Sequence, residues 1–217
     1  NVEKLVANRV SGGLSENEAR AYVENRMNDA IATDQLLINL EKISDVCNAH
    51  GIAMASHDDD TIAKTNLMAD IGAVISEFPV TLEAAETAAS RGLMIAMGAP
   101  NAMRGQSYSG NLSAREAHAA GLLHILAADY HPGAILPAIR ALAAVRSGDL
   151  LGAVRLVSVN PAQALGLNDR GRIEPGMRAD LAIADNKDRI VRTLSAGNVI
   201  FCNGTLAQPA SVAVAAA

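Results

Sequence analysis

Four short runs of apolar residues, each followed by a segment of helical character, limit most strongly what this chain can fold into. The runs are Ile52–Ser56, Ala73–Ser76, Leu93–Met97 and Ile125–Ala128. They are continuous rather than alternating, as is typical of parallel strands that are covered on both faces. The helical segments are Ile62–Ala69, Leu82–Arg91, Ala114–Ala120 and Ala134–Val145. This α/β rhythm predicts either half of a (β/α)8 TIM barrel or an open doubly wound sheet.

The residues that end each run favour the barrel. The runs lead into His57-Asp58-Asp59, Glu77-Phe78-Pro79, Gly98-Ala99-Pro100-Asn101 and Asp129-Tyr130-His131. Barrel enzymes build their active sites from the C-terminal ends of several strands. The sequence has no G-x-G-x-x-G fingerprint and no Walker loop, which weakens a nucleotide-binding doubly wound sheet. We therefore expect half of a TIM barrel, with its site at these strand ends.

The segments on either side of this repeat suggest three regions. Ser15–His50 has helical periodicity, with a capping box at Ser15 and Glu18 and a break expected near Thr33–Asp34. Beyond Pro161 the chain becomes rich in turns. Three short strands are then expected, at Ala179–Ala184, Ile190–Leu194 and Val199–Cys202. We assign residues 1–165 to the barrel half, 166–208 to a small β-sandwich segment and 209–217 to a tail.

Composition excludes several classes of function. The formal net charge is −5, and without a block of Lys or Arg this argues against binding to nucleic acid or to a membrane surface. No run reaches the roughly 18 uncharged apolar residues of a membrane span. Two cysteines are too few for a disulfide framework, so a reducing, cytoplasmic location is expected.

His57 and the acids after it predict a metal site. A neutral imidazole at a strand end is a common zinc ligand, and a nearby carboxylate such as Asp58 can orient it, bind a second ion or contact substrate. We expect this histidine to be buried. The alternative is that the segment only begins a helix, since Asp60 or Thr61 could cap it. Both interpretations can hold, because capping needs only one of these residues.

Two further acids follow strands. Asp129 comes after the fourth run, where a carboxylate can ligate a metal and take a proton from water. Glu77, after the second run, is a weaker candidate for the same metal. The alternatives are that Asp129 caps the next helix and that Glu77 is simply solvated.

A Gly/Ser-rich loop at Arg104–Asn111 precedes a helix that opens with a second capping box, Ser113 and Glu116. Backbone N–H groups, hydroxyls and a guanidinium before a helix suit a phosphate or another anion, although an ordinary polar loop has the same composition. His131 lies in a loop that could touch substrate, whereas His50, His118 and His124 are expected to be structural. No nucleophilic Ser or Cys stands in a recognisable catalytic motif. The candidate substrate-binding residues are Arg104, Ser107, Tyr108, Ser109, Asn111, Asp58 and His131.

Five ordered motifs resemble one family. They are Ala55-Ser56-His57-Asp58-Asp59, Ser76-Glu77-Phe78-Pro79, Met97-Gly98-Ala99-Pro100-Asn101, Arg104–Asn111 and Ala128-Asp129-Tyr130. Together they resemble the diphosphatases of the carbon–phosphorus lyase pathway, a branch of the amidohydrolase superfamily that acts on α-D-ribose 1-methylphosphonate 5-triphosphate. Asn160-Pro161-Ala162 and Ala179-Asp180-Leu181 are similar to that superfamily's return into its β domain.

The resemblance implies a metal-dependent (β/α)8 barrel in which this chain supplies strands five to eight. His57 would be a metal ligand, Asp129 a metal ligand and general base, and Glu77 would stand where many amidohydrolases have a histidine. The metal would be zinc or manganese, as one or two ions. Arg104, Ser107, Ser109 and Asn111 would meet the phosphates or the phosphonate of a small phosphorylated substrate.

Two departures from the family pattern qualify this expectation. The branch has Arg-Gly-Gly-Ser-His-Ser-Gly-Asn in the loop, where this chain has Gln106 and Tyr108 in place of Gly and His. Tyrosine can donate a hydrogen bond but is not readily deprotonated near neutral pH. The resemblance also places the strand-one histidines and the strand-four ligand before Asn1. We therefore expect the chain to need an N-terminal half of the same protein as its partner, with a homo-oligomer left open.

Three functions follow from these observations. The first is a metal-dependent diphosphatase that releases pyrophosphate from the triphosphate. The second is an amidohydrolase that acts on a cyclic amide or an N-acyl bond, which Tyr108 favours. The third is a non-catalytic barrel segment that serves in assembly.

Overall fold

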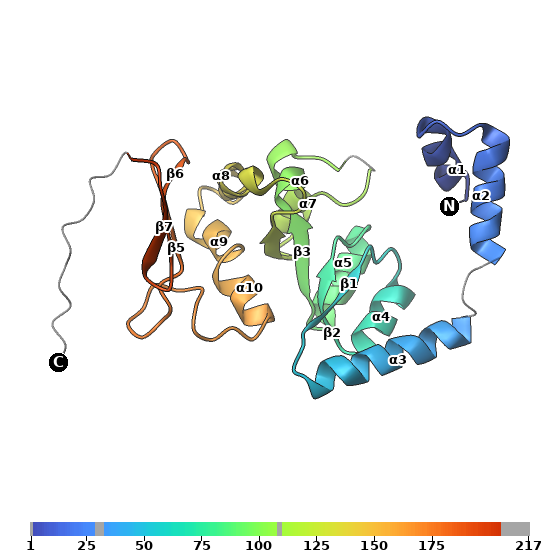
Figure 1. The fold of residues 1–217 in the computed structure, drawn as a ribbon, viewed down its shortest axis with the longest axis horizontal. Coiled ribbons are helices and arrows are strands. Elements are labelled where there is room, and N and C mark those ends of the chain that lie inside the picture. The colour runs from blue at the N-terminus through green and yellow to red at the C-terminus, as the bar shows by residue number, and fades with distance from the viewer. Residues whose placement is uncertain (1, 29–32, 108–109, 205–217) are drawn as a thin grey trace. The chain divides into compact units, whose positions relative to one another are not determined.

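The computed structural model describes residues 2–28, 33–107 and 110–204. It divides into two compact units, Asn1–Val46 and Cys47–Ala217, which are described separately (Figure 1). This division concerns the helices that precede the parallel sheet. The boundaries expected after residues 165 and 208 stay predictions.

The first unit is helical. It contains α1 (Val2–Ser11), α2 (Glu16–Asn28) and most of α3 (Thr33–Ala49). The Ser15–Glu18 capping box is present: the Ser15 amide donates to Glu18 Oε2 at 2.9 Å, and the Glu18 amide donates to Ser15 Oγ at 3.3 Å. The start of α3 at Thr33 agrees with the expected break. Helix α1 was not predicted; it packs on α2 through Val6, Ala19 and Val23.

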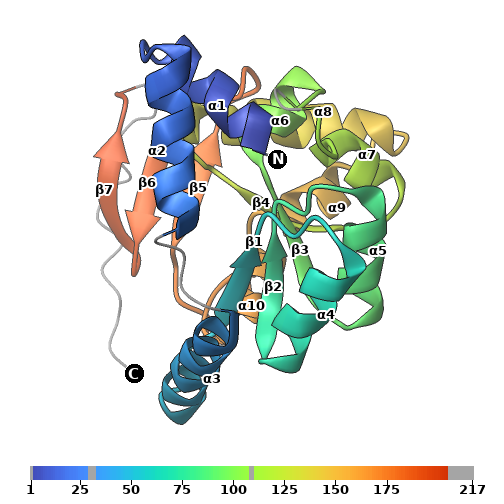
Figure 2. The same cartoon turned by 90° about the vertical axis from the view of Figure 1, so that its right-hand side faces the viewer.

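The second unit is built on a parallel sheet in the order β1-β2-β3-β4. The strands are β1 (Met54–His57), β2 (Ala73–Glu77), β3 (Met94–Gly98) and β4 (Leu123–Ala127). Each predicted strand is confirmed within one or two residues at either end. Helices α4 (Ile62–Asp70) and α5 (Leu82–Ser90) lie on the same side of this sheet (Figure 2).

Small side chains let the helices approach the sheet closely. Ala84, Ala85 and Ala88 of α5 are completely buried, and Ala85 and Ala88 share one core with Ile95 and Met97 of β3. The core continues into α7 (Ala114–Ala119) and, after the 3₁₀ turn η1 (Pro132–Ala134), into α8 (Ile135–Val145). The four predicted helices of the repeat are therefore confirmed.

Two helices that the sequence did not predict follow strand β3 and helix α8. They are α6 (Ala99–Arg104) and α9 (Leu150–Arg155). The end of α6 is stabilised from a distance, because Arg115 of α7 donates to the carbonyl oxygens of Ala102 and Met103, both at 2.8 Å. The Arg115 guanidinium packs against Gly105, where a Cβ would lie 2.9 Å from its Cζ. Periodicity within six residues could not reveal this support.

The three strands predicted after α10 (Val159–Ala164) are present. They are β5 (Leu181–Ala184), β6 (Ile190–Ser195) and β7 (Asn198–Cys202), which form an antiparallel sheet. Arg140 of α8 binds Asp188 of the β5–β6 turn, with Nη2 2.9 Å from Oδ1. Among the described residues, no helix is long and apolar enough to cross a membrane.

Candidate functional site

The strand register places His57 and Glu77 side by side. They are direct partners at the C-terminal ends of β1 and β2, and Glu77 in turn pairs with Ala96 of β3. Partners on neighbouring parallel strands lie about 4.8 Å apart and point to the same face. Ser56 and Ser76, one residue earlier, are also partners and point to the opposite, buried face. His57 and Glu77 therefore share the face that is not covered by α4.

His57 is exposed, so the expectation of a buried histidine is wrong. Its side chain is 56% exposed because it points away from the face on which α4 packs. Its Nδ1 lies 3.2 Å from Asp58 Oδ2, and its ring meets the ring of Phe78 edge to face, with centroids 5.3 Å apart. A carboxylate at Nδ1 favours the tautomer in which the Nε2 lone pair can bind a metal.

Asp129 lies over the end of strand β3. A Cβ at Gly98 would lie 3.0 Å from Asp129 Oδ2 and 3.3 Å from Phe78 Cε1. Since the Phe78 ring also contacts His57, the contacts join Asp129, Gly98, Phe78 and His57 in one row along the strand ends. The alternative role of Asp129 as a helix cap is not observed, because the following η1 turn is preceded by His131 at the N-cap position.

Three strand ends share an unusual backbone conformation. Asp58, Phe78 and Asp129 have φ angles of 54°, 51° and 54°, in the left-handed region. This conformation costs a non-glycine residue about 1–2 kcal/mol, and such strain is concentrated at functional sites. Strands β1, β2 and β4 are therefore each followed by a strained backbone position at the end of the sheet that carries the candidate ligands.

The acidic residues after His57 differ in burial and in the contacts they make. Asp58 is exposed beside the imidazole, whereas Asp59 is completely buried behind the strand. Thr61 caps α4, with its side chain accepting from the Lys64 amide at 3.3 Å. Sequence reasoning identified the cap but missed the buried role of Asp59. It also missed Phe78 and Gly98, whose importance arises only from contacts between strands.

The expected anion-binding loop is partly described. Arg104 Nη1 donates to the hydroxyl of Tyr130 at 2.5 Å, which brings the guanidinium to the loop that carries Asp129. Ser107 and Asn111 are half-buried, while Tyr108 and Ser109 lie outside the described residues. The Ser113–Glu116 capping box is confirmed, with bonds of 2.9 and 3.1 Å.

Three further histidines of this unit have separate environments. His131 is exposed next to Gly133, and so it remains a candidate for substrate contact. His124 Nδ1 accepts from the Ile95 amide at 3.2 Å and thereby joins β4 to β3. His118 is buried in α7, where desolvation first and then the positive charge of Arg146 lower its pKa. The structural roles expected for His118 and His124 fit these contacts.

The donor types at the strand ends suit a divalent metal, but their number does not complete a site. Imidazole and carboxylate ligands are the set used by catalytic zinc, and carboxylates also suit manganese. Among the described residues, no three His, Cys, Asp or Glu side chains come together as a metal centre. His57, Glu77 and Asp129 thus fit a metal only as part of a larger set of ligands.

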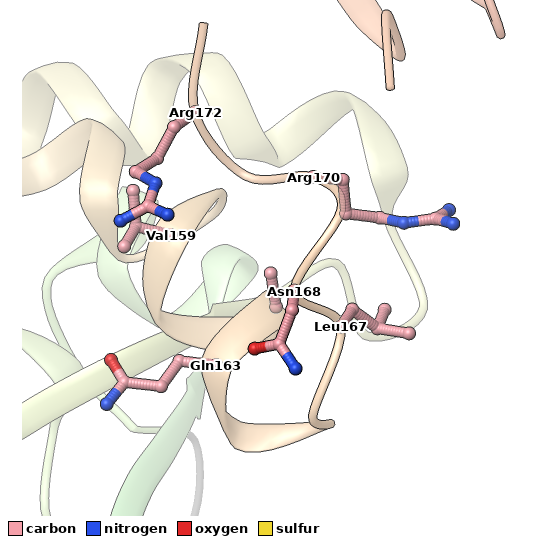
Figure 3. Close-up of a pocket in the computed structure, with 7 residues that line it drawn as sticks. Val159, Gln163, Leu167, Asn168, Arg170 and Arg172 are labelled. Carbon is pink, nitrogen blue, oxygen red and sulfur yellow. The ribbon is translucent and has the colours of Figure 1, made fainter. Parts of the chain in front are cut away.

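A pocket of about 330 Å³ lies elsewhere in the unit. Its lining comes from α10 and the segment after it, and the Arg170 side chain extends away from α10 (Figure 3). Asn160 of α10 donates to the carbonyl of His124, near the start of β4, at 2.8 Å. None of the candidate ligands or substrate contacts lines this pocket.

Comparisons with known proteins agree with this architecture. A sequence profile described as the amidohydrolase family matches residues 33–201. The chain is 45% identical over 177 residues to the α-D-ribose 1-methylphosphonate 5-triphosphate diphosphatase of Escherichia coli (strain K12). That match covers 81% of this chain and 46% of the relative, so the chain spans about half the relative's length.

Solved structures share the fold at low sequence identity. A β-aspartyl dipeptidase from Fervidobacterium islandicum AW-1 superimposes with a TM-score of 0.59 at 17% identity, over 82% of this chain and 55% of that one. An N-acetyl-D-glucosamine-6-phosphate deacetylase from Mycobacterium smegmatis gives 0.55 at 22% identity, over 75% and 51%. The profile match across most of the sequence and the parallel strand–helix repeat lead to one conclusion: this chain belongs to the amidohydrolase family.

Proposed function

We propose that this chain forms the C-terminal barrel half of a metal-dependent hydrolase of phosphonate metabolism. Its substrate would be α-D-ribose 1-methylphosphonate 5-triphosphate, from which it would release pyrophosphate. The observation that carries this proposal is the row His57, Phe78, Gly98 and Asp129 at the strand ends. The similarity to the Escherichia coli diphosphatase supports the choice of substrate.

The candidate residues divide into ligands and substrate contacts. His57, Asp129 and Glu77 would hold one or two divalent ions, zinc or manganese. A metal in such a site supplies Lewis-acid chemistry, lowering the pKa of water and neutralising charge that develops on oxygen. Asp129 accepts the proton of the attacking water through its carboxylate. As the new oxygen–phosphorus bond forms, the bond from that phosphorus to the bridging oxygen breaks and pyrophosphate leaves.

Arg104 would bind the departing phosphates. Tyr130 holds its guanidinium by a 2.5 Å hydrogen bond beside the loop of Asp129. A guanidinium binds phosphate oxygens in a bidentate manner and stays charged at all relevant pH values. Ser107, Tyr108, Ser109 and Asn111, with Asp58 and His131, complete the proposed substrate contacts.

The remaining metal ligands belong to the proposed partner, an N-terminal half of the same protein. Two observations support this. The described residues do not gather three ligands, and the chain spans 46% of its diphosphatase relative. A cytoplasmic location is part of the same proposal, in keeping with the two free cysteines, Cys47 and Cys202.

Phosphorus NMR tests the reaction. The protein expressed from its complete open reading frame, with zinc or manganese, should convert the triphosphate to pyrophosphate and a monophosphate. His57→Ala and Asp129→Ala should each lower kcat at least 100-fold, since each removes a ligand and Asp129→Ala also removes the base. His50→Ala, at an exposed histidine after α3, is the matched control and should keep full activity.

An unchanged triphosphate spectrum from folded, metal-loaded protein would contradict the diphosphatase proposal. The same preparation would then be assayed with a dihydropyrimidine and an N-acyl amino acid. Hydrolysis of either would establish the amidohydrolase alternative. Failure of the complete protein to bind any divalent metal would favour a non-catalytic role.

A further inference from the structure

Lys64 binds the backbone on both sides of a strained residue. Its ammonium donates to the carbonyl oxygens of His57 and Asp58, each at 2.8 Å, and lies 3.4 Å from Asp59 Oδ1. Lys64 belongs to the first turn of α4, where the helix dipole disfavours a positive charge. The three oxygens offset this disadvantage, because they supply negative charge beyond the helix end.

Asp59 anchors this lysine from a fully buried position. Its side chain is 0% exposed, and its Oδ2 accepts hydrogen bonds from the hydroxyls of Ser56 and Ser76. Among the described residues, Oδ1 has no hydrogen-bond partner, and the Lys64 ammonium lies 3.4 Å from it. A buried carboxylate is retained only where charge and hydrogen bonds compensate its desolvation, so this pair is a specific arrangement.

The network joins the two strands that carry the candidate ligands. Ser56 belongs to β1 and Ser76 to β2, and the two residues are partners in the sheet. The Asp58 amide adds a backbone bond to the carbonyl of Glu77 at 3.0 Å. Asp58, with its left-handed φ of 54°, is thus held on both sides by contacts from outside its own segment.

We propose that Lys64 and Asp59 are positioning residues that fix His57 relative to Glu77 for metal binding. The inference rests on the proposed function, because it takes His57 as a ligand. Both side chains act from the face of β1 on which α4 packs, opposite to the face of His57 and Glu77. They therefore act through the His57 backbone and not by contact with substrate.

The test compares four variants of the complete protein. Lys64→Met removes the ammonium, and Lys64→Arg keeps a positive charge. The double variant Lys64→Met/Asp59→Asn removes both charges, so that no unpaired buried carboxylate remains to unfold the protein. Lys187→Met, at an exposed lysine between β5 and β6, is the control. The measurements are zinc affinity by chelator competition, amide hydrogen exchange of residues 57–61 in metal-free protein, and the thermal midpoint.

Loss of the positioning network should weaken zinc binding by about 10- to 100-fold, as is typical when groups that orient a ligand are removed. Lys64→Met should also speed exchange at residues 57–61. Lys64→Arg should recover part of both properties, and Lys187→Met should match the unchanged protein. The double variant should recover the thermal midpoint while its zinc affinity stays low.

Two results would overturn the inference. One is unchanged zinc affinity and exchange in Lys64→Met; the other is a double variant that recovers zinc affinity along with stability, which would show the pair to be only stabilising. The His57→Ala variant separates this from the parent proposal. If His57→Ala retains full zinc affinity, then His57 is not a ligand and the parent proposal fails. This conclusion does not depend on the hydrogen-exchange result for Lys64→Met.

Discussion

Gly98 matters because of the side chain it lacks. It ends β3 between the carboxylate of Asp129 and the ring of Phe78, which approach the place of a Cβ to 3.0 and 3.3 Å. Its own φ is not in the left-handed region, so backbone freedom is not what requires glycine here. Glycine is required for space, since a methyl group here would lie 3.0 Å from the Asp129 carboxylate.

We predict that Gly98→Ala lowers activity more than stability. The new methyl group must displace the Asp129 carboxylate or the Phe78 ring by a few tenths of an ångström. A misplaced catalytic group can cost on the order of 100-fold in rate, so kcat should fall 10- to 100-fold. Steady-state kinetics and thermal melting of the complete protein would measure both quantities.

The control for this variant is Gly12→Ala, where the nearest atoms lie 3.4 and 3.5 Å from the place of the Cβ. It should leave kcat unchanged. A Gly98→Ala protein with full activity would show that Asp129 does not work from its observed position.

At the scale of elements, α7 buries a histidine whose pKa is lowered by its surroundings. His118 is buried against α8, and its pKa is lowered by desolvation first and then by Arg146. The charge of Asp149 and a hydrogen bond to the Leu142 backbone raise the pKa, but their combined effect is smaller than the lowering. The folded protein therefore favours the neutral imidazole.

This predicts a loss of stability in mild acid. The unfolded state binds a proton near the ordinary pKa of 6.5, while the folded state resists it until lower pH. The contribution of His118 is thus complete above about pH 6.5 and is lost as the pH falls from there through the lowered pKa. Thermal midpoints of the unchanged protein and of His118→Gln should be measured between pH 7.5 and 5. The difference between the two midpoints should shrink as the pH is lowered.

Parallel curves for the unchanged protein and His118→Gln would contradict the assignment of this acid sensitivity to His118.

At the scale of the whole molecule, both sheets of the second unit present surface that the described residues do not cover. Strands β1 and β4 are the edges of the parallel sheet, and Val74 on β2 is exposed. On β7, three consecutive apolar residues are exposed: Val199, Ile200 and Phe201. Unpaired strand edges and clustered apolar side chains are typical of surfaces that bind another segment or chain.

We therefore predict that these 217 residues, expressed alone, self-associate and have no hydrolase activity. Light scattering after gel filtration and binding of a hydrophobic dye would detect the uncovered surface. The complete protein should show less dye binding per chain and should be active with metal. A stable, dye-negative monomer of the 217-residue chain would contradict the need for a partner half.

Much of the fold could be predicted from local sequence. Continuous apolar runs identified β1 to β4, and short apolar segments separated by turn residues identified β5 to β7. Both signals are local, because a strand's residue pattern and the turn residues that end it lie within a few positions of one another. The capping boxes at Ser15 and Ser113 were equally visible. His57, Glu77 and Asp129 were chosen because they stand at the C-terminal ends of parallel strands, and the strand register makes two of them, His57 and Glu77, direct partners.

What only the tertiary structure decided depends on contacts between distant residues. Helix α6 is completed by Arg115 of α7, and the histidine expected to be buried is exposed because His57 and Ser56 point to opposite faces of β1. Asp59 is one of three consecutive aspartates that the sequence does not distinguish. Of the three, it is the one that is buried, where it binds Ser56, Ser76 and Lys64. The sequence by itself thus determined the strands, most of the helices and the end of the sheet at which the candidate ligands stand. The packing of separate elements decided which side chains lie on the face of the sheet that carries His57 and Glu77, and which are buried on the opposite face.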